Sequence, residues 1–179
     1  ISVAATSLSL LGSLAAVGTY HPAVGGYQHE VFVPWIRSLG IGFHLGVDGI
    51  SVVLVLLHAF CAFTGVLISY SIKERVKEYC CFYLILITGV FGVFLSLDVF
   101  FFYVFYEMAV IPMYPLIGIW GSDVQEHGVV RFSKEYAAMK LTIYLTLGAV
   151  VALIGLLWLY VSAGAGTFDL VTLQHHFVE

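Results

Sequence analysis

The sequence predicts an all-α fold, a polytopic transmembrane helix bundle that forms a single membrane domain over residues 1–179. Its composition excludes a water-soluble protein, because 61% of the residues are hydrophobic and only 10% are charged, whereas about a quarter of the residues in soluble domains are charged. No alternating pattern of a membrane barrel is present, so the spans are expected to be helices. Five apolar windows are each long enough to cross a hydrocarbon layer of about 30 Å, namely residues 2–20, 50–70, 80–97, 99–120 and 137–162.

The first window, residues 2–20, has no basic region before it as a secretory signal would have. We expect the chain to be an excerpt of a longer protein. Residues 21–49 follow as a long connection with two prolines and several glycines, and we expect this segment to be a loop along the outer membrane surface. Residues 41–45 alternate weakly, and this short pattern leaves strand and loop equally open.

The second window, residues 50–70, places His58 near its middle. A neutral imidazole at this depth either relays protons or hydrogen-bonds a neighbouring helix, and the second interpretation is favoured. Haem binding between two axial histidines requires a second histidine deep in a span, which the sequence lacks, so a cytochrome is excluded. Three cysteines lie in or beside apolar windows and imply no disulfide framework and no metal site.

The third window, residues 80–97, is preceded by a short basic connection. Residues 71–79 contain three basic side chains and residues 121–136 contain two, whereas the other connections contain only Arg37. Positive charge concentrates on the cytoplasmic side of membrane proteins. The connections 71–79 and 121–136 are therefore predicted to lie together on the cytoplasmic side.

The fourth window, residues 99–120, contains the carboxylate Glu107 about 12 Å from its beginning, at 1.5 Å per residue. This depth is close to the bilayer centre, where an ionised carboxylate without a partner is costly. Glu107 is therefore expected to face other helices or water, and it is suited to taking up and releasing protons. The alternative is a neutral acid that hydrogen-bonds a neighbouring helix and has a structural role only. Asp98, just before this window, and Asp48, before the second window, are predicted to cap helix N-termini.

Two prolines follow Glu107 in the same window. Pro112 and Pro115 remove the hydrogen bonds to the carbonyls of Met108 and Ile111. A helix break with free carbonyls is expected there, and water or side chains must satisfy these carbonyls. The hydroxyls of Tyr103, Tyr106 and Tyr114 are candidates to extend a hydrated proton path.

The fifth window, residues 137–162, contains Lys140 about one turn from its beginning. This lysine either extends its ammonium to the interface or takes part in a channel, and the sequence leaves both open. Gly148 and Gly155 suit close helix packing. No phosphate-binding loop, nucleophile motif or zinc-ligand spacing is present, so no catalytic residue and no bound cofactor or metal are expected in this chain.

Three segments of the sequence resemble the antiporter-like membrane subunits of NADH-quinone oxidoreductase (respiratory complex I), and among them the M or chain 4 type. They are LGIGFHLGVDGIS before the second window, SLDVFFFYVFYEMAVIPMYPLIGIWG over the fourth, and KEYAAMKLTIYLTLGAVVALIG at the fifth. Members of this family have about fourteen helices, so this chain is expected to be the N-terminal part of such a subunit. Tyr106 and Pro115 depart from the usual pattern of the fourth helix.

The resemblance implies a proton-translocating membrane-arm subunit that couples quinone reduction elsewhere in the complex to proton pumping. In the family, the glutamate at the position of Glu107 pairs with a lysine on a later, broken helix, which would lie beyond Glu179. The expected partners are lipid and other membrane-arm subunits, further antiporter-like subunits included. Flavin, iron-sulfur clusters, NADH and quinone are expected on other subunits. The expected location is an energy-transducing membrane such as the bacterial inner membrane.

Two alternatives stay open on the sequence. The first is a cation/proton antiporter of the Mrp type or a membrane-hydrogenase relative, in which Glu107 would serve cation-coupled exchange. The second is a non-transporting membrane scaffold, in which Glu107 is structural. A surrounding of Glu107 without water or cation would favour the scaffold.

Overall fold

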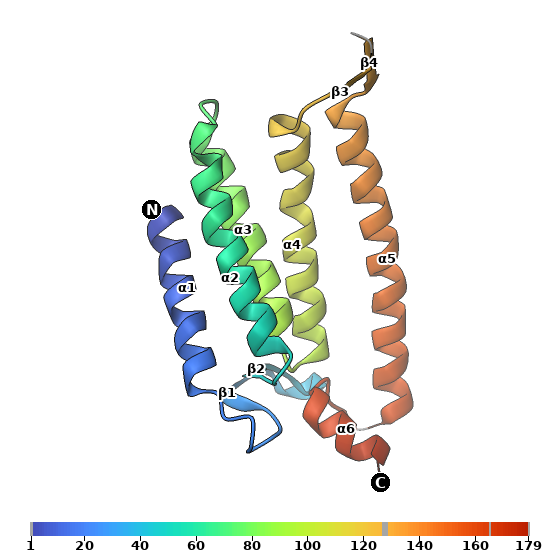
Figure 1. The fold of residues 1–179 in the computed structure, drawn as a ribbon. Coiled ribbons are helices and arrows are strands. Elements are labelled where there is room, and N and C mark those ends of the chain that lie inside the picture. The colour runs from blue at the N-terminus through green and yellow to red at the C-terminus, as the bar shows by residue number, and fades with distance from the viewer. Residues whose placement is uncertain (1, 127–128, 165, 179) are drawn as a thin grey trace.

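The computed structural model describes residues 2–126, 129–164 and 166–178, and within these ranges five long helices run side by side (Figure 1). All five are long and apolar enough to cross a membrane. This arrangement confirms the predicted polytopic helix bundle. A short sixth helix lies across one end of the bundle. The helices are α1 (Ser2–Thr19), α2 (Ser51–Ile68), α3 (Val76–Leu95), α4 (Val99–Trp120), α5 (Lys134–Ala163) and α6 (Leu170–Val178).

Two helices begin earlier than the hydropathy windows indicate. Helix α3 begins at Val76 and α5 at Lys134, whereas the windows begin at residues 80 and 137. The added turns contain charged residues, which lower the hydropathy of a window although they suit a helix end in contact with water. The hydroxyl of Ser133 also accepts a hydrogen bond from the Tyr136 backbone N–H and so caps α5.

The bundle is a row in which α4 packs between α3 and α5, and α1 packs on α2. Large apolar side chains point outward from most helices, as expected where hydrocarbon replaces water. Helix α5 is the extreme case, since only 6% of its apolar window is buried within this chain. The described helices therefore cover only one narrow face of α5.

Small residues allow α3 and α4 to approach closely. A Cβ atom at Gly89 of α3 would lie 2.7 Å from the backbone nitrogen of Ala109 and 2.9 Å from the Phe105 carbonyl oxygen. Backbone atoms cannot move aside as a flexible side chain can, so this contact requires glycine. By contrast, Gly148 and Gly155 of α5, which were expected to serve close packing, have open space around them within the described chain.

Replacement of Gly89 by alanine is expected to destabilise the bundle by about 1–3 kcal/mol, the usual cost of overpacking. The added methyl group would force α3 away from α4 over their whole contact. Thermal unfolding of the purified protein in detergent measures this effect. Gly148→Ala is the matched control, because its methyl group meets no atom within 4 Å, and equal losses of stability in the two variants would contradict the prediction.

The segment 21–49 is not the plain loop that was expected, because it forms an antiparallel hairpin. Strand β1 (Gln28–Ile36) pairs with β2 (Ile41–Val47), with Pro34 opposite Gly42. Strand β1 was missed because it is almost fully exposed and contains a proline, which is tolerated at a sheet edge. A second hairpin, β3 (Val124–Glu126) with β4 (Val129–Phe132), lies at the opposite end of the bundle (Figure 1). Residues 127–128 of the expected connection 121–136 lie outside the described residues.

Candidate functional site

Glu107 lies on the fourth helix, eight residues after its first residue Val99, and its side chain is half-buried. Tyr103 lies one turn earlier on the same face of the helix, near enough to Glu107 for their side chains to interact. Helical periodicity places Ile111 and Tyr114 on the same face, and these side chains are 67% and 50% exposed. The face of α4 that carries the carboxylate is therefore left open by the helices described.

Lys140, the other charged candidate, is not brought to Glu107. A Cβ atom at Gly118 of α4 would lie 3.7 Å from the Cβ of Ala138 of α5, which fixes the relative height of these antiparallel helices. Lys140 then lies near the height of Leu116, about 13 Å along the axis from Glu107 at 1.5 Å per residue. Its Nζ lies 5.9 Å from the ring centroid of Tyr136, near the start of α5. Over the described residues, Glu107 forms no ion pair.

His58 lies between α2 and α3. Its Nε2 is 3.2 Å from the carbonyl oxygen of Ile87, so the ring N–H donates across the helix interface. The rings of Phe91 and Phe94 surround the imidazole, with centroids at 4.7 and 6.1 Å. This geometry matches the interhelical hydrogen bond that the sequence favoured.

Helix α4 continues through both prolines as one helix from Val99 to Trp120. Pro112 and Pro115 thus remove two backbone hydrogen bonds without dividing α4 into two helices, and the kink expected at these prolines stays a prediction. Pro112 is fully buried, so packing holds the turn that lacks its hydrogen bond. Proline is tolerated in this way when neighbouring helices support the backbone.

Asp98 caps α4 as predicted and does more than cap it. Its Oδ1 accepts hydrogen bonds from the backbone N–H groups of Phe100 and Phe101, at 2.9 and 3.1 Å. Its Oδ2 accepts a third, at 3.1 Å, from the N–H of Gly42 in β2. The carboxylate is completely buried. Burial raises the pKa of Asp98, and the three N–H donors only partly offset this effect.

Asp48 caps α2, also as predicted. Its carboxylate accepts from the Ser51 N–H at 2.6 Å, and the Ser51 hydroxyl accepts from the Asp48 N–H at 2.9 Å. This reciprocal pair is a capping box. Hydrogen bonds from Ser51 lower the pKa of Asp48.

Next to Asp98 the structure brings together a polar cluster that the sequence analysis did not identify. His44 of β2 is nearly buried, with its Nδ1 2.6 Å from Asp169 Oδ1 and its Nε2 3.5 Å from Glu30 Oε2. Burial alone would raise the pKa of Asp169, but hydrogen bonds from Thr172 and His44 lower it. The one available signal was local, since Asp169 and Thr172 have the spacing of a helix cap. Nothing in the sequence links Asp169 to His44.

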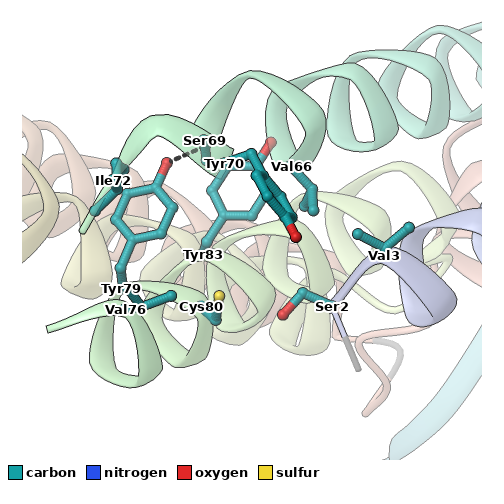
Figure 2. A pocket seen from close by; sticks show the side chains of 10 residues that line it. All are labelled: Ser2, Val3, Val66, Ser69, Tyr70, Ile72, Val76, Tyr79, Cys80 and Tyr83. Carbon is teal, nitrogen blue, oxygen red and sulfur yellow. Dashed lines mark hydrogen bonds between the residues drawn. The ribbon is translucent and has the colours of Figure 1, made fainter. Parts of the chain in front are cut away.

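At the opposite end of the bundle, a cavity of about 380 Å³ lies between α1, α2 and α3. Figure 2 shows its hydroxyl-bearing side chains, among them Ser69 and Tyr79, whose oxygens are 2.7 Å apart. None of the ten lining residues is a carboxylate, lysine, arginine or histidine. The cavity therefore offers no ionised group for proton exchange, and the candidate site remains on α4.

Comparisons with known proteins agree with the sequence resemblance. The family described as NADH:quinone oxidoreductase/Mrp antiporter, TM, matches residues 96–179. Subunit M of the NADH-quinone oxidoreductase of Rhodobacter capsulatus is 36% identical over 174 residues, which are 97% of this chain and 31% of that protein. Subunit M of Escherichia coli (strain K12) is 35% identical over 156 residues, 84% of this chain and 30% of that protein. The chain thus spans about a third of the length of these relatives.

Two solved structures share the fold. A chain of respiratory complex I from Thermus thermophilus, solved with bound NADH, superposes with a TM-score of 0.78 at 24% identity, covering 98% of this chain and 34% of that chain. A chain of the archaeal membrane-bound sulfane sulfur reductase superposes with a TM-score of 0.72 at 22% identity, covering 96% and 33%. At this level of identity, the likeness concerns the helix arrangement.

Proposed function

We propose that the chain is part of a proton-translocating membrane-arm subunit of NADH-quinone oxidoreductase, because its residues 96–179 match the NADH:quinone oxidoreductase/Mrp antiporter transmembrane family. The single observation that carries the proposal is the place of Glu107, a carboxylate deep in the apolar helix α4 within the matched segment. Carboxylates at such depth are costly to ionise and are characteristic of proton paths.

Glu107 is the group that takes up and releases the proton. Tyr103, one turn away, would offer the carboxyl group a hydroxyl that can accept or donate a hydrogen bond as the proton is bound and released. The open face around Ile111 and Tyr114 is where the rest of the path would run. A lysine on a helix beyond Glu179 is the expected counter-charge, and its approach would favour the ionised carboxylate.

The redox chemistry takes place on other subunits. The proposal places flavin, iron-sulfur clusters, NADH and quinone there, and this chain contributes only the proton path in an energy-transducing membrane. Its neighbours would be other membrane-arm subunits, including antiporter-like ones. The basic connections 71–79 and 121–136 would face the cytoplasm. Redox-driven proton pumping by a Glu107→Gln variant of the full-length subunit tests this function, and a large loss of pumping is expected.

A second candidate, a cation/proton antiporter, is favoured by the description of the matching family, which also includes Mrp antiporters. The experiment that separates the two measures sodium-dependent proton exchange by the full-length protein in vesicles without NADH or quinone. A complex I subunit is expected to show no such exchange. Sodium-driven exchange that disappears in Glu107→Gln would instead favour the antiporter.

A further inference from the structure

We propose that His44 is a proton-operated clasp, which in its protonated form holds the hairpin against the start of α6 and so fixes the end of α4 that leads to Glu107. The inference concerns the hairpin end of the bundle, where β2, the start of α4 and the start of α6 meet (Figure 1). It goes beyond the proposed function, because that function assigns no role to these residues.

The geometry around His44 suits an imidazolium. Both ring nitrogens face carboxylate oxygens, Nδ1 toward Asp169 at 2.6 Å and Nε2 toward Glu30 at 3.5 Å. A neutral imidazole has only one N–H, so one of its nitrogens would present a lone pair to an ionised carboxylate. Only the protonated ring can donate to both acids, and histidine ordinarily changes charge between about pH 5 and 8.

Two carboxylates face this ring, and a third acid lies near one of them. Glu30 belongs to β1, Asp169 precedes α6, and Asp98 precedes α4, close enough to Asp169 for the two charges to repel each other. The ring of Phe32 in β1 covers the imidazole edge to face, with centroids 5.3 Å apart. No lysine or arginine pairs with these three acids within the described residues. The protonated His44 is therefore the cation that pairs with Glu30 and Asp169.

Backbone hydrogen bonds tie the same segments together, so a change at His44 reaches α4. The N–H of Leu97 donates to the His44 carbonyl at 2.8 Å, and the N–H of Val99 donates to the Phe168 carbonyl at 2.9 Å. The Leu170 N–H donates to the Leu97 carbonyl at 2.8 Å. Loss of the positive charge on His44 weakens the contacts of β2 with the starts of α4 and α6. A low pH on the hairpin side, which protonates His44, strengthens them. Helix α4 would thus be held more firmly when protons accumulate there.

Hydrogen–deuterium exchange of the assembled full-length complex at pH 6 and pH 8 tests the clasp, after correction for the intrinsic pH dependence of exchange. In the natural protein, the protection factors of amides 97–99 and 168–173 are expected to be about tenfold lower at pH 8 than at pH 6. This is the effect expected from the loss of one charge-assisted hydrogen bond. In His44→Gln, which keeps a neutral N–H donor, protection is expected to be the same at both pH values. Equal pH dependence in the natural protein and in His44→Gln would overturn the proposal.

Two further variants keep the test decisive if His44→Gln fails to assemble. Glu30→Gln removes one of the two facing carboxylates at a half-exposed position and is expected to reduce the pH dependence. His29→Asn, on the same hairpin, is the matched control, because His29 contacts Thr19 instead of the clasp and asparagine tolerates its positive φ of 57°. An effect of His29→Asn as large as that of Glu30→Gln would also overturn the proposal.

The clasp and the proposed function fail in distinguishable ways. Proton pumping by the natural protein is expected to change with the pH on the hairpin side, and this change is expected to be absent in His44→Gln. If Glu107→Gln pumps normally while the exchange result holds, the clasp stands without the proposed proton path. If His44→Gln leaves both the exchange and the pumping profile unchanged, the clasp alone is rejected.

Discussion

Replacement of Glu107 by glutamine in the full-length subunit is expected to reduce redox-driven proton pumping about a hundredfold, at the lower end of what a positioned acid–base group contributes. Glutamine has the size of glutamate and keeps hydrogen-bonding atoms near Tyr103, but it cannot release or bind a proton at neutral pH. The measurement is proton uptake into sealed vesicles driven by NADH oxidation, with assembly of the complex quantified separately.

The control for this variant is Glu135→Gln, the same substitution at an exposed position in the first turn of α5. It is expected to pump at the natural rate. Glu107→Asp is expected to retain part of the activity, because it keeps the carboxyl group but shortens its reach to Tyr103. Unchanged pumping by Glu107→Gln in a fully assembled complex would favour the scaffold alternative, in which the carboxyl group only holds helices together.

The sequence predicted the membrane helices well, because hydrophobicity over about 20 residues is the physical requirement for a span. It failed where polar contacts formed only in three dimensions. Strand β1 has exposed, mixed side chains and exists because β2 pairs with it. Helix α6 is nine residues long, too short for a hydropathy window, and Asp169 at its start fixes its position.

Glu107 and the cluster around His44 also differ in how far the sequence alone could identify them. Glu107 was identifiable from the sequence because an acid stands out in an apolar helix. The cluster around His44 was not identifiable, because His44 and Asp169 are 125 residues apart in the sequence. Each member alone is an ordinary polar residue in a connection. Only the fold shows that Glu30 and Asp169 share one histidine.

The second large effect is expected at Asp98. Replacement by alanine would remove the fully buried carboxylate that accepts hydrogen bonds from the N–H groups of Gly42, Phe100 and Phe101. Each unsatisfied buried donor costs about 1–3 kcal/mol, so the loss of stability is expected to be about 3 kcal/mol or more. Thermal unfolding in detergent measures it, and the yield of assembled complex is expected to fall with it.

Asp48→Ala separates this effect from ordinary capping. Asp48 also caps a helix, but its side chain is only partly buried, so its removal is expected to cost about 1 kcal/mol of stability.

The loss of stability in Asp98→Asn should lie between the losses in Asp98→Ala and Asp48→Ala. The amide oxygen of asparagine still accepts hydrogen bonds, but its NH₂ group faces one of the three N–H donors. Burial raises the pKa of Asp98 in the folded protein above its value in the unfolded chain. The stability of the natural protein therefore falls as the pH rises and the buried carboxyl group ionises, and it increases again when this group is protonated at lower pH. The difference in stability between Asp98→Asn and the natural protein should therefore become smaller as the pH rises. A difference that becomes larger with pH would contradict a raised pKa of Asp98.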